Sequence, residues 1–201
     1  GTHAAGGTVV PFNARTRGLH LHHIITKSDA SIIVVKDEYF EHLVDLDDLG
    51  AIRQVVVVGE APGVDNLHGA TVVDFNRWIA DQPAELPGDL PDWNENALIQ
   101  FTSGTTGLAK GVIYSHHYLY LASAVLVDSL QQTEDDILFT PLPVYHVAAM
   151  HFVGNLSLHA GCTGYLMTSF SPGEYFQQAA QSGATFSIIL GPMAAIIDKR
   201  T

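Results

Sequence analysis

The chain is poor in cations and in cysteine. Its 201 residues include 9 Lys and Arg against 21 Asp and Glu, which gives a net charge of -12, and one cysteine, Cys162. Nucleic acids and anionic membranes bind surfaces with clustered Lys and Arg, so we predict no nucleic-acid partner. One cysteine excludes an internal disulfide, and its apolar neighbours favour a buried, inert thiol over a nucleophile.

Long apolar runs are also missing. No run reaches the roughly 18 residues of a membrane-spanning helix, and no signal peptide opens the chain. We therefore predict no transmembrane segment and a cytoplasmic location. The apolar residues make up 47% of the chain and the charged residues 15%, which is typical of a folded globular protein.

Short apolar runs alternate with amphipathic stretches, which predicts an α/β fold of layered αβ sheets with helices packed on them. Strands are expected at residues 8–11, 31–35, 54–58, 71–73, 97–101, 111–114, 137–139, 163–167 and 185–190. Helices are expected at residues 16–28, 37–44, 75–80, 116–130, 147–159, 172–182 and 192–201. The proline-rich, acidic residues 82–96 predict a linker between one αβ subdomain, 1–81, and another, 97–201.

Two of the expected helices carry capping signals at their starts. Ser115 is the expected N-cap of the helix that ends near Leu130, because its hydroxyl can accept from a first-turn amide. Ser171 and Glu174 have the spacing of a capping box, with Pro172 at the first helical position.

Residues 102–111, Thr-Ser-Gly-Thr-Thr-Gly-Leu-Ala-Lys-Gly, are the most informative stretch of the chain. They follow the apolar run 97–101, which predicts a buried strand. Glycines let successive backbone N–H groups point at a ligand, and hydroxyls and an ammonium add donors for anionic oxygens. We therefore predict a polyphosphate-binding loop. Its predicted binding residues are Thr102, Ser103, Gly104, Thr105, Thr106, Gly107 and Lys110.

Other phosphate loops do not fit this stretch. A Walker A loop needs Gly immediately before the Lys, where this chain has Ala109, and Thr105 with Thr106 interrupts a dinucleotide fingerprint. The stretch resembles the signature loop of the adenylate-forming (AMP-binding) acyl-CoA synthetases, Thr-Ser-Gly-(Ser/Thr)-Thr-Gly-x-Pro-Lys-Gly. One position differs, because Ala109 replaces the usual Pro. That change loosens the backbone before Lys110 and removes no donor.

Two further segments carry the same resemblance. Pro-Leu-Pro-Val-Tyr-His at residues 141–146 resembles the family's Pro-Leu-Phe-His stretch, and Val-Pro-Phe-Asn-Ala-Arg at residues 10–15 resembles Val-Pro-Ile-Asn-x-Arg. The resemblance implies that His146 lies beside the acyl carboxylate. The alternative is a histidine that caps the start of its own helix. Along that helix, Val147, Met150 and Val153 either line the acyl side or pack in the core.

The resemblance implies an ATP-dependent acid–thiol ligase, similar to crotonobetaine/carnitine–CoA ligases. Such an enzyme activates a carboxylic acid as an acyl-adenylate and transfers the acyl group to CoA, with Mg²⁺ sharing the phosphate charge. Lys110 and His146 are the implied catalytic residues, and no residue of this chain is predicted to ligate a metal. The family's adenine-binding strand and its C-terminal domain with a catalytic lysine do not appear before Thr201. We therefore expect part of the large N-terminal domain.

Other interpretations stay open at this point. An amino-acid-activating adenylation domain would need an Asp for the substrate amine near His146, and Val147-Ala148-Ala149 offers none. A non-catalytic nucleotide-binding remnant is a second alternative, whereas a serine hydrolase lacks its Gly-x-Ser-x-Gly elbow. A local histidine cluster favours a solvated surface over a metal site; its members are His20, His22 and His23. The acyl substrate and the oligomeric state are left open.

Overall fold

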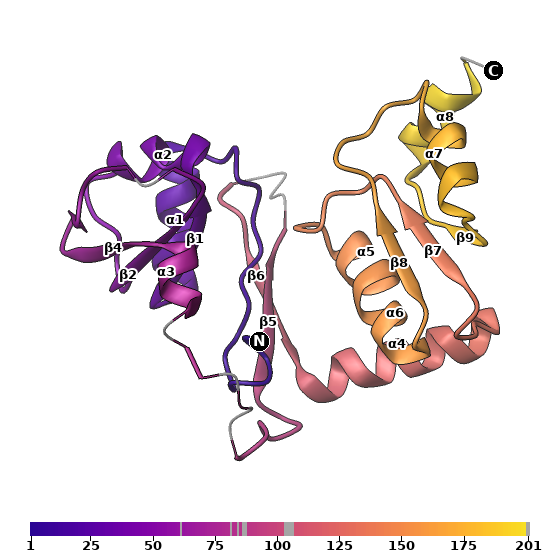
Figure 1. Ribbon diagram of the computed structural model, residues 1–201, viewed down its shortest axis with the longest axis horizontal. Helices are drawn as coiled ribbons and strands as arrows, with labels where there is room; N and C mark the ends of the chain where they lie inside the picture. Colours follow the sequence, from indigo (N-terminus) through magenta and orange to yellow (C-terminus); the bar gives the residue numbers. More distant parts are fainter. Residues whose placement is uncertain (61, 81, 84, 86–87, 103–106, 200–201) are drawn as a thin grey trace. The chain divides into compact units, whose positions relative to one another are not determined.

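The computed structural model describes residues 1–60, 62–80, 82–83, 85, 88–102 and 107–199 (Figure 1). Part of the predicted phosphate loop therefore lies outside the described residues, namely Ser103, Gly104, Thr105 and Thr106. The chain forms two compact units, residues 1–91 with 97–113 and residues 92–96 with 114–201. This grouping differs from a division at residues 82–96, because the strand after that stretch pairs with the N-terminal segment. The subdomain boundaries remain a prediction.

The sheet of the first unit has the strand order β1-β2-β4-β3. Strands β1 (Ile32–Lys36), β2 (Gln54–Val58) and β4 (Ala70–Asp74) are parallel, and β3 (Asn66–Leu67) is antiparallel to β4. Strand β2 is central. Its valines Val55, Val56 and Val57 are fully buried, as a continuous β-branched stretch in a parallel sheet predicts.

Helices cover both faces of this sheet. Helix α1 (Gly18–Ser28), the 3₁₀ turn η1 (Asp37–Tyr39) and helix α2 (Glu41–Val44) follow the predicted helices. Buried residues of α1 and α2 pack in one core with Val55 and Val57. The side chain of Gln54 points to the opposite face, where it accepts a hydrogen bond from Trp78 Nε1 at 3.0 Å. Helix α3 (Phe75–Ala80) therefore covers that face (Figure 1).

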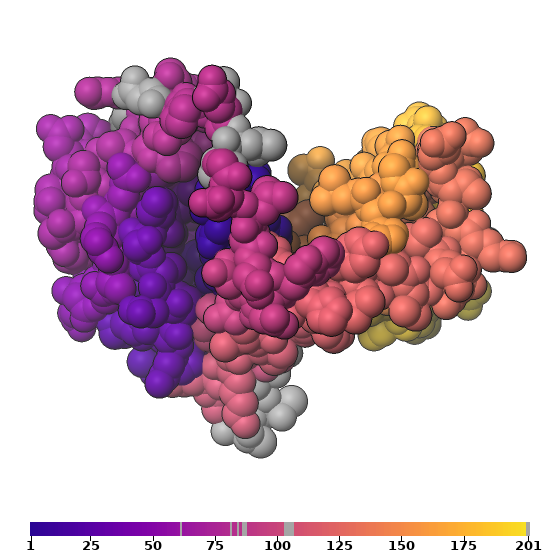
Figure 2. All heavy atoms as spheres, turned by 90° about the horizontal axis from the view of Figure 1, so that it is seen from below, coloured from indigo at the N-terminus to yellow at the C-terminus, as the bar shows by residue number. Residues whose placement is uncertain are grey.

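A second sheet consists of β5 (Asn96–Phe101) and β6 (Gly111–Ser115), of which residues 97–101 and 111–113 belong to the first unit. The strand expected at residues 8–11 is reduced to one parallel bridge between Val9 and Leu98. Val9 N–H donates to the Ala97 carbonyl at 2.9 Å, and Ile99 N–H donates to the Val9 carbonyl at 2.9 Å. Figure 2 shows the N-terminal segment, in indigo, beside the strand that it pairs with.

The second unit has a parallel sheet of order β8-β7-β9, formed by β7 (Ile137–Thr140), β8 (Thr163–Leu166) and β9 (Phe186–Ser187). Strand β9 is shorter than the predicted 185–190. The reason is that Pro141, the residue directly after β7, has no N–H to continue the ladder. The hydroxyl of Thr140 donates instead to the Ile188 carbonyl at 2.9 Å.

Helix α4 (His116–Leu130) begins as predicted at Ser115, whose hydroxyl accepts from the Tyr118 N–H at 3.2 Å. Two carbonyls of the preceding loop accept the other first-turn amides. His116 N–H donates to Glu95 at 3.1 Å, and His117 N–H donates to Trp93 at 2.8 Å. Three of the four orphan amides of this helix start are therefore satisfied.

The remaining helices follow the predicted order with two corrections. The helix predicted at 147–159 consists of α5 (Val147–Ala149), a π-helical segment, η2 (Met150–Asn155), and α6 (Leu156–Ala160). The predicted capping box at Ser171 is wrong. Helix α7 (Tyr175–Ser182) begins three residues later than predicted, because the Ser171 carbonyl accepts the Glu174 N–H in a turn. Helix α8 (Gly191–Asp198) follows, with its proline in the first turn. None of the helices among the described residues has the length and apolar character needed to cross a membrane.

Candidate phosphate-binding site

The predicted phosphate loop connects β5 to β6, and Thr102 and Lys110 close its base. Thr102 N–H donates to the Lys110 carbonyl at 3.0 Å. The Thr102 hydroxyl donates to the same carbonyl at 3.4 Å. The structure therefore brings these two predicted residues together, each at one end of the connection.

The side chain of Lys110 is exposed, and no carboxylate of the described residues pairs with its ammonium group. Gly107 is also exposed. In a chain of net charge -12, this ammonium is a local positive charge that is open to an anionic ligand. Gly111 lets β6 pass close to β5 immediately after the lysine. A Cβ at that position would lie 3.0 Å from Ile99 Cγ2 and 3.5 Å from the Phe101 ring.

His23 supports both ends of this connection. Its Nε2 lies 2.8 Å from the Ala109 carbonyl, and its ring contacts Phe101 edge-on with centroids 6.3 Å apart. The sequence interpretation missed this contact. The other two members of the histidine cluster do not share it, because His22 pairs with Asp48 at 3.2 Å and His20 is exposed. Among the described residues, no group of three or more His, Cys, Asp or Glu could hold a metal ion.

His146 belongs to the second unit, where it is the N-cap of α5. Its Nδ1 accepts the Ala148 N–H at 3.4 Å, and its own N–H donates to the Pro143 carbonyl at 2.9 Å. The neutral ring then carries its proton on Nε2, because Nδ1 acts as the acceptor. The side chain is exposed. The alternative role as a helix cap is therefore real, and it leaves a hydrogen-bond donor on the outer nitrogen.

The residues that follow His146 separate into two kinds. Val153 is 2% exposed and packs with Leu138 and Leu156, so it belongs to the core. Val147 and Met150 are partly buried, and the acyl-side role predicted for them stays a prediction.

His151 is a buried histidine that the sequence did not single out. It is 7% exposed, and its ring centroid lies 5.6 Å from that of Tyr114 and 6.2 Å from that of Tyr118. Burial lowers the pKa of His151, because desolvation disfavours the charged imidazolium. The π-helical segment therefore carries a neutral imidazole among aromatic rings near neutral pH.

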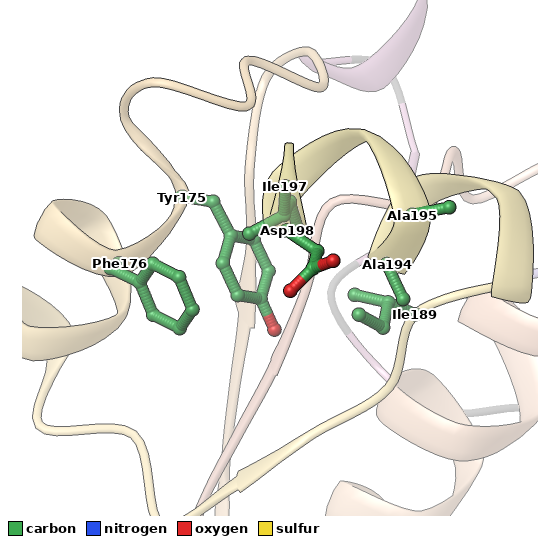
Figure 3. Close-up of a pocket in the computed structure, with 7 residues that line it drawn as sticks. All are labelled: Tyr175, Phe176, Ile189, Ala194, Ala195, Ile197 and Asp198. Carbon is green, nitrogen blue, oxygen red and sulfur yellow. The ribbon is translucent and has the colours of Figure 1, made fainter. Parts of the chain in front are cut away.

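The second unit also contains a pocket of about 560 Å³ that none of the sequence-predicted site residues lines. Figure 3 shows the carboxylate of Asp198 between the Tyr175 ring and the side chains of Ile189 and Ala194. The lining is otherwise mostly apolar, and Phe176 contacts Tyr175 edge-on at 5.2 Å. This pocket is a feature separate from the predicted site residues.

Known proteins similar to this chain include CoA ligases. A crotonobetaine/carnitine–CoA ligase of Citrobacter koseri is 30% identical over 184 residues, which cover 90% of this chain and 35% of that protein. A mitochondrial malonate–CoA ligase of Homo sapiens is 28% identical over 179 residues, which cover 89% of this chain and 29% of that protein. The chain thus spans about a third of the length of these relatives.

Solved structures show the same fold. An anthranilate CoA ligase in complex with anthranoyl-AMP has a TM-score of 0.80 at 20% identity, covering 90% of this chain and 35% of that chain. A long-chain-fatty-acid–CoA ligase of Archaeoglobus fulgidus has a TM-score of 0.78 at 22% identity, covering 98% of this chain and 37% of that chain. The predicted α/β fold of adenylate-forming enzymes is confirmed.

The family model described as AMP-binding enzyme matches residues 1–197. That match includes β5, the connection that carries Lys110, and the His146 segment. The chain belongs to the AMP-binding enzyme family.

Proposed function

We propose that this chain carries the phosphate-binding loop and part of the acyl site of an ATP-dependent acid–CoA ligase. The observation that carries the proposal is the family's signature stretch placed between two paired strands, with Lys110 exposed at its end. The similar proteins named above as CoA ligases support the same reaction class. A cytoplasmic location is part of the proposal.

The chemistry requires a carboxylate oxygen to attack the α-phosphate of ATP, so that an acyl-adenylate forms and pyrophosphate leaves. Catalysis of this kind depends on positioning and on stabilising negative charge. We assign Lys110 and the Thr102 hydroxyl to the phosphates that leave. The CoA thiol then displaces AMP from the adenylate and forms the thioester.

His146 has the hydrogen-bonding state that this role requires. Because Nδ1 accepts from the helix, the Nε2–H can donate to one oxygen of the acyl carboxylate and orient the other toward phosphorus. We assign no residue of this chain to Mg²⁺. The ion would enter as the Mg²⁺ complex of ATP.

The first test is carboxylate-dependent ATP–pyrophosphate exchange with a panel of acids, on the protein at its natural length. We expect Lys110→Ala to weaken ATP use by about 10- to 100-fold, since a hydrogen bond to a charged group contributes roughly 1.5–3 kcal/mol. Lys27→Ala, which removes an exposed lysine of α1, is the matched control.

Three outcomes separate the candidate functions. Exchange with simple carboxylic acids supports the acid–CoA ligase, whereas exchange with amino acids alone supports an adenylation domain. No exchange with any acid, in a protein that is folded, supports a non-catalytic relative of the family. Unchanged ATP kinetics in Lys110→Ala would remove this lysine from the site.

A further inference from the structure

We propose that His23 is a positioning residue that fixes the end of the phosphate loop from which Lys110 projects. His23 lies on α1, 86 positions before Ala109 in the chain, and its Nε2 donates to the Ala109 carbonyl at 2.8 Å. That carbonyl belongs to the peptide that joins Ala109 to Lys110. A hydrogen bond to it sets the orientation of the peptide plane directly before the lysine.

The same imidazole also contacts the other end of the connection. Its ring meets Phe101, the last residue of β5, edge-on with an interplanar angle of 79°. Helix α1 is a firm support for this ring, because its residues Leu21, Ile24 and Ile25 are at most 7% exposed. One side chain of the first unit therefore holds the entry and the exit of the loop.

The identity of residue 109 explains why such a contact matters. A proline there would fix φ near −65°, whereas alanine leaves this dihedral free. The other polar group of the Ala109–Lys110 peptide is the Lys110 N–H, and no hydrogen bond among the described residues uses it. The peptide is therefore oriented from its carbonyl side, by His23.

The consequence concerns the direction of Lys110. An ordered peptide before the lysine presents its ammonium in one arrangement, so that a ligand does not have to order the backbone when it binds. Loss of the His23 contact transfers that ordering to the binding step. The inference rests on the proposed function only for the identity of the anion that the loop binds.

The test is backbone hydrogen exchange in the protein at its natural length, without ligand. His23→Phe keeps an aromatic ring against Phe101 and removes the donor to Ala109. We expect the Thr102 amide, which bonds to the Lys110 carbonyl, to exchange roughly fivefold faster, as the loss of one ordinary hydrogen bond predicts. His20→Phe makes the same replacement at an exposed position of α1 and should leave this exchange unchanged.

A second pair of variants distinguishes positioning from general support of the fold. His23→Gln keeps an N–H donor and should stay near the wild type. Adding Ala109→Pro to His23→Phe should restore slow exchange at Thr102, because proline restricts φ of residue 109, immediately before the peptide that His23 orients. Exchange at Val56, in the buried centre of β2, reports whether each variant is folded. Equal exchange at Thr102 in wild type and His23→Phe, or no rescue by proline, would overturn the proposal.

Titration with MgATP provides the link to function. We expect His23→Phe to raise the Kd roughly fivefold, with rescue by Ala109→Pro. A wild-type protein that does not bind MgATP would contradict the proposed function, while the exchange measurements would still decide the role of His23. Tight MgATP binding with an unchanged Kd in His23→Phe would overturn the positioning role alone.

Discussion

Both units contain parallel strands with helices packed against them, yet they bury their sheets to different degrees. In the first unit, the central strand β2 has three consecutive valines with no exposed surface, and one core cluster joins it to α1 and α2. In the second unit, the central strand β7 is equally buried, but every residue of its neighbour β8 is exposed. The buried residues around β7 form several smaller clusters.

This difference indicates how each unit responds to the truncation of a core side chain. A broad core divides its stabilisation over many side chains, so one truncation removes a small share of it. A core of small clusters depends on the largest residue of each cluster. The largest fully buried side chain of the second unit is Phe139, which stacks on Tyr165 at 5.5 Å and meets Tyr175 edge-on at 5.5 Å.

The largest expected effect on stability comes from truncating one buried side chain in the core of each unit. We expect Phe139→Ala to lower the free energy of unfolding by about 3–5 kcal/mol, because a large cavity replaces the ring. Val57→Ala in β2 removes two methyl groups and should lower it by roughly 2 kcal/mol. Urea unfolding of both variants measures the two values. A loss for Val57→Ala as large as that for Phe139→Ala would contradict the comparison.

The sequence predicted the first unit more accurately because its elements follow local rules. Strand β2 and helix α3 have the predicted bounds, since a valine run and an amphipathic stretch need no distant partner to be recognised. Strand β3 was missed because it has two residues. Its signal was the turn at His68 and Gly69, where both φ angles are positive, at 49° and 90°.

The features of the candidate site also divide into those that follow from the local sequence and those that depend on distant contacts. The density of donors in residues 102–111 predicts a phosphate loop, and the resemblance of residues 141–146 implies a role for His146; both roles stay predictions. The contact of His23 with Ala109 could not be predicted, because it joins residues 86 positions apart through the packing of α1. The shift of the α7 start had a similar cause, since a local turn at Ser171 prevailed over its capping pattern.

An intermediate effect tests the two predicted helix caps of the second unit. We expect Ser115→Ala to lower the free energy of unfolding by about 1 kcal/mol, because it leaves the Tyr118 N–H without its acceptor. Ser171→Ala makes the same replacement at the incorrectly predicted cap and should change stability very little. Thermal unfolding of both variants measures the difference. Equal losses would mean that the turn at Ser171 contributes as much as a true cap.

The smallest expected effect on stability concerns two exposed carboxylates, one from each unit. Asp37 accepts the N–H groups of Glu60 and Glu38, each at 2.8 Å, and these bonds lower the pKa of Asp37 below its usual 3.8. Asp136 accepts the Thr133 N–H at 2.7 Å, which together with a bond from a threonine hydroxyl lowers the pKa of Asp136. Each carboxylate hydrogen-bonds to residues that follow or precede strands of its own unit: Asp37 follows β1 and binds Glu60 after β2, and Asp136 precedes β7 and binds Thr185 before β9.

Because both folded-state pKa values are depressed, the stabilisation from Asp37 and Asp136 is present above about pH 4 and is lost as pH falls through the folded pKa. We expect Asp37→Asn and Asp136→Asn each to weaken the protein near pH 7 and to match wild type more closely near pH 3. Solvent screens both groups, so each effect is small. Urea unfolding at the two pH values, followed by hydrogen exchange in each unit, assigns the loss to β1–β2 or to β7–β9. A loss that is the same at both pH values would show that the carboxylates act by shape and not by charge.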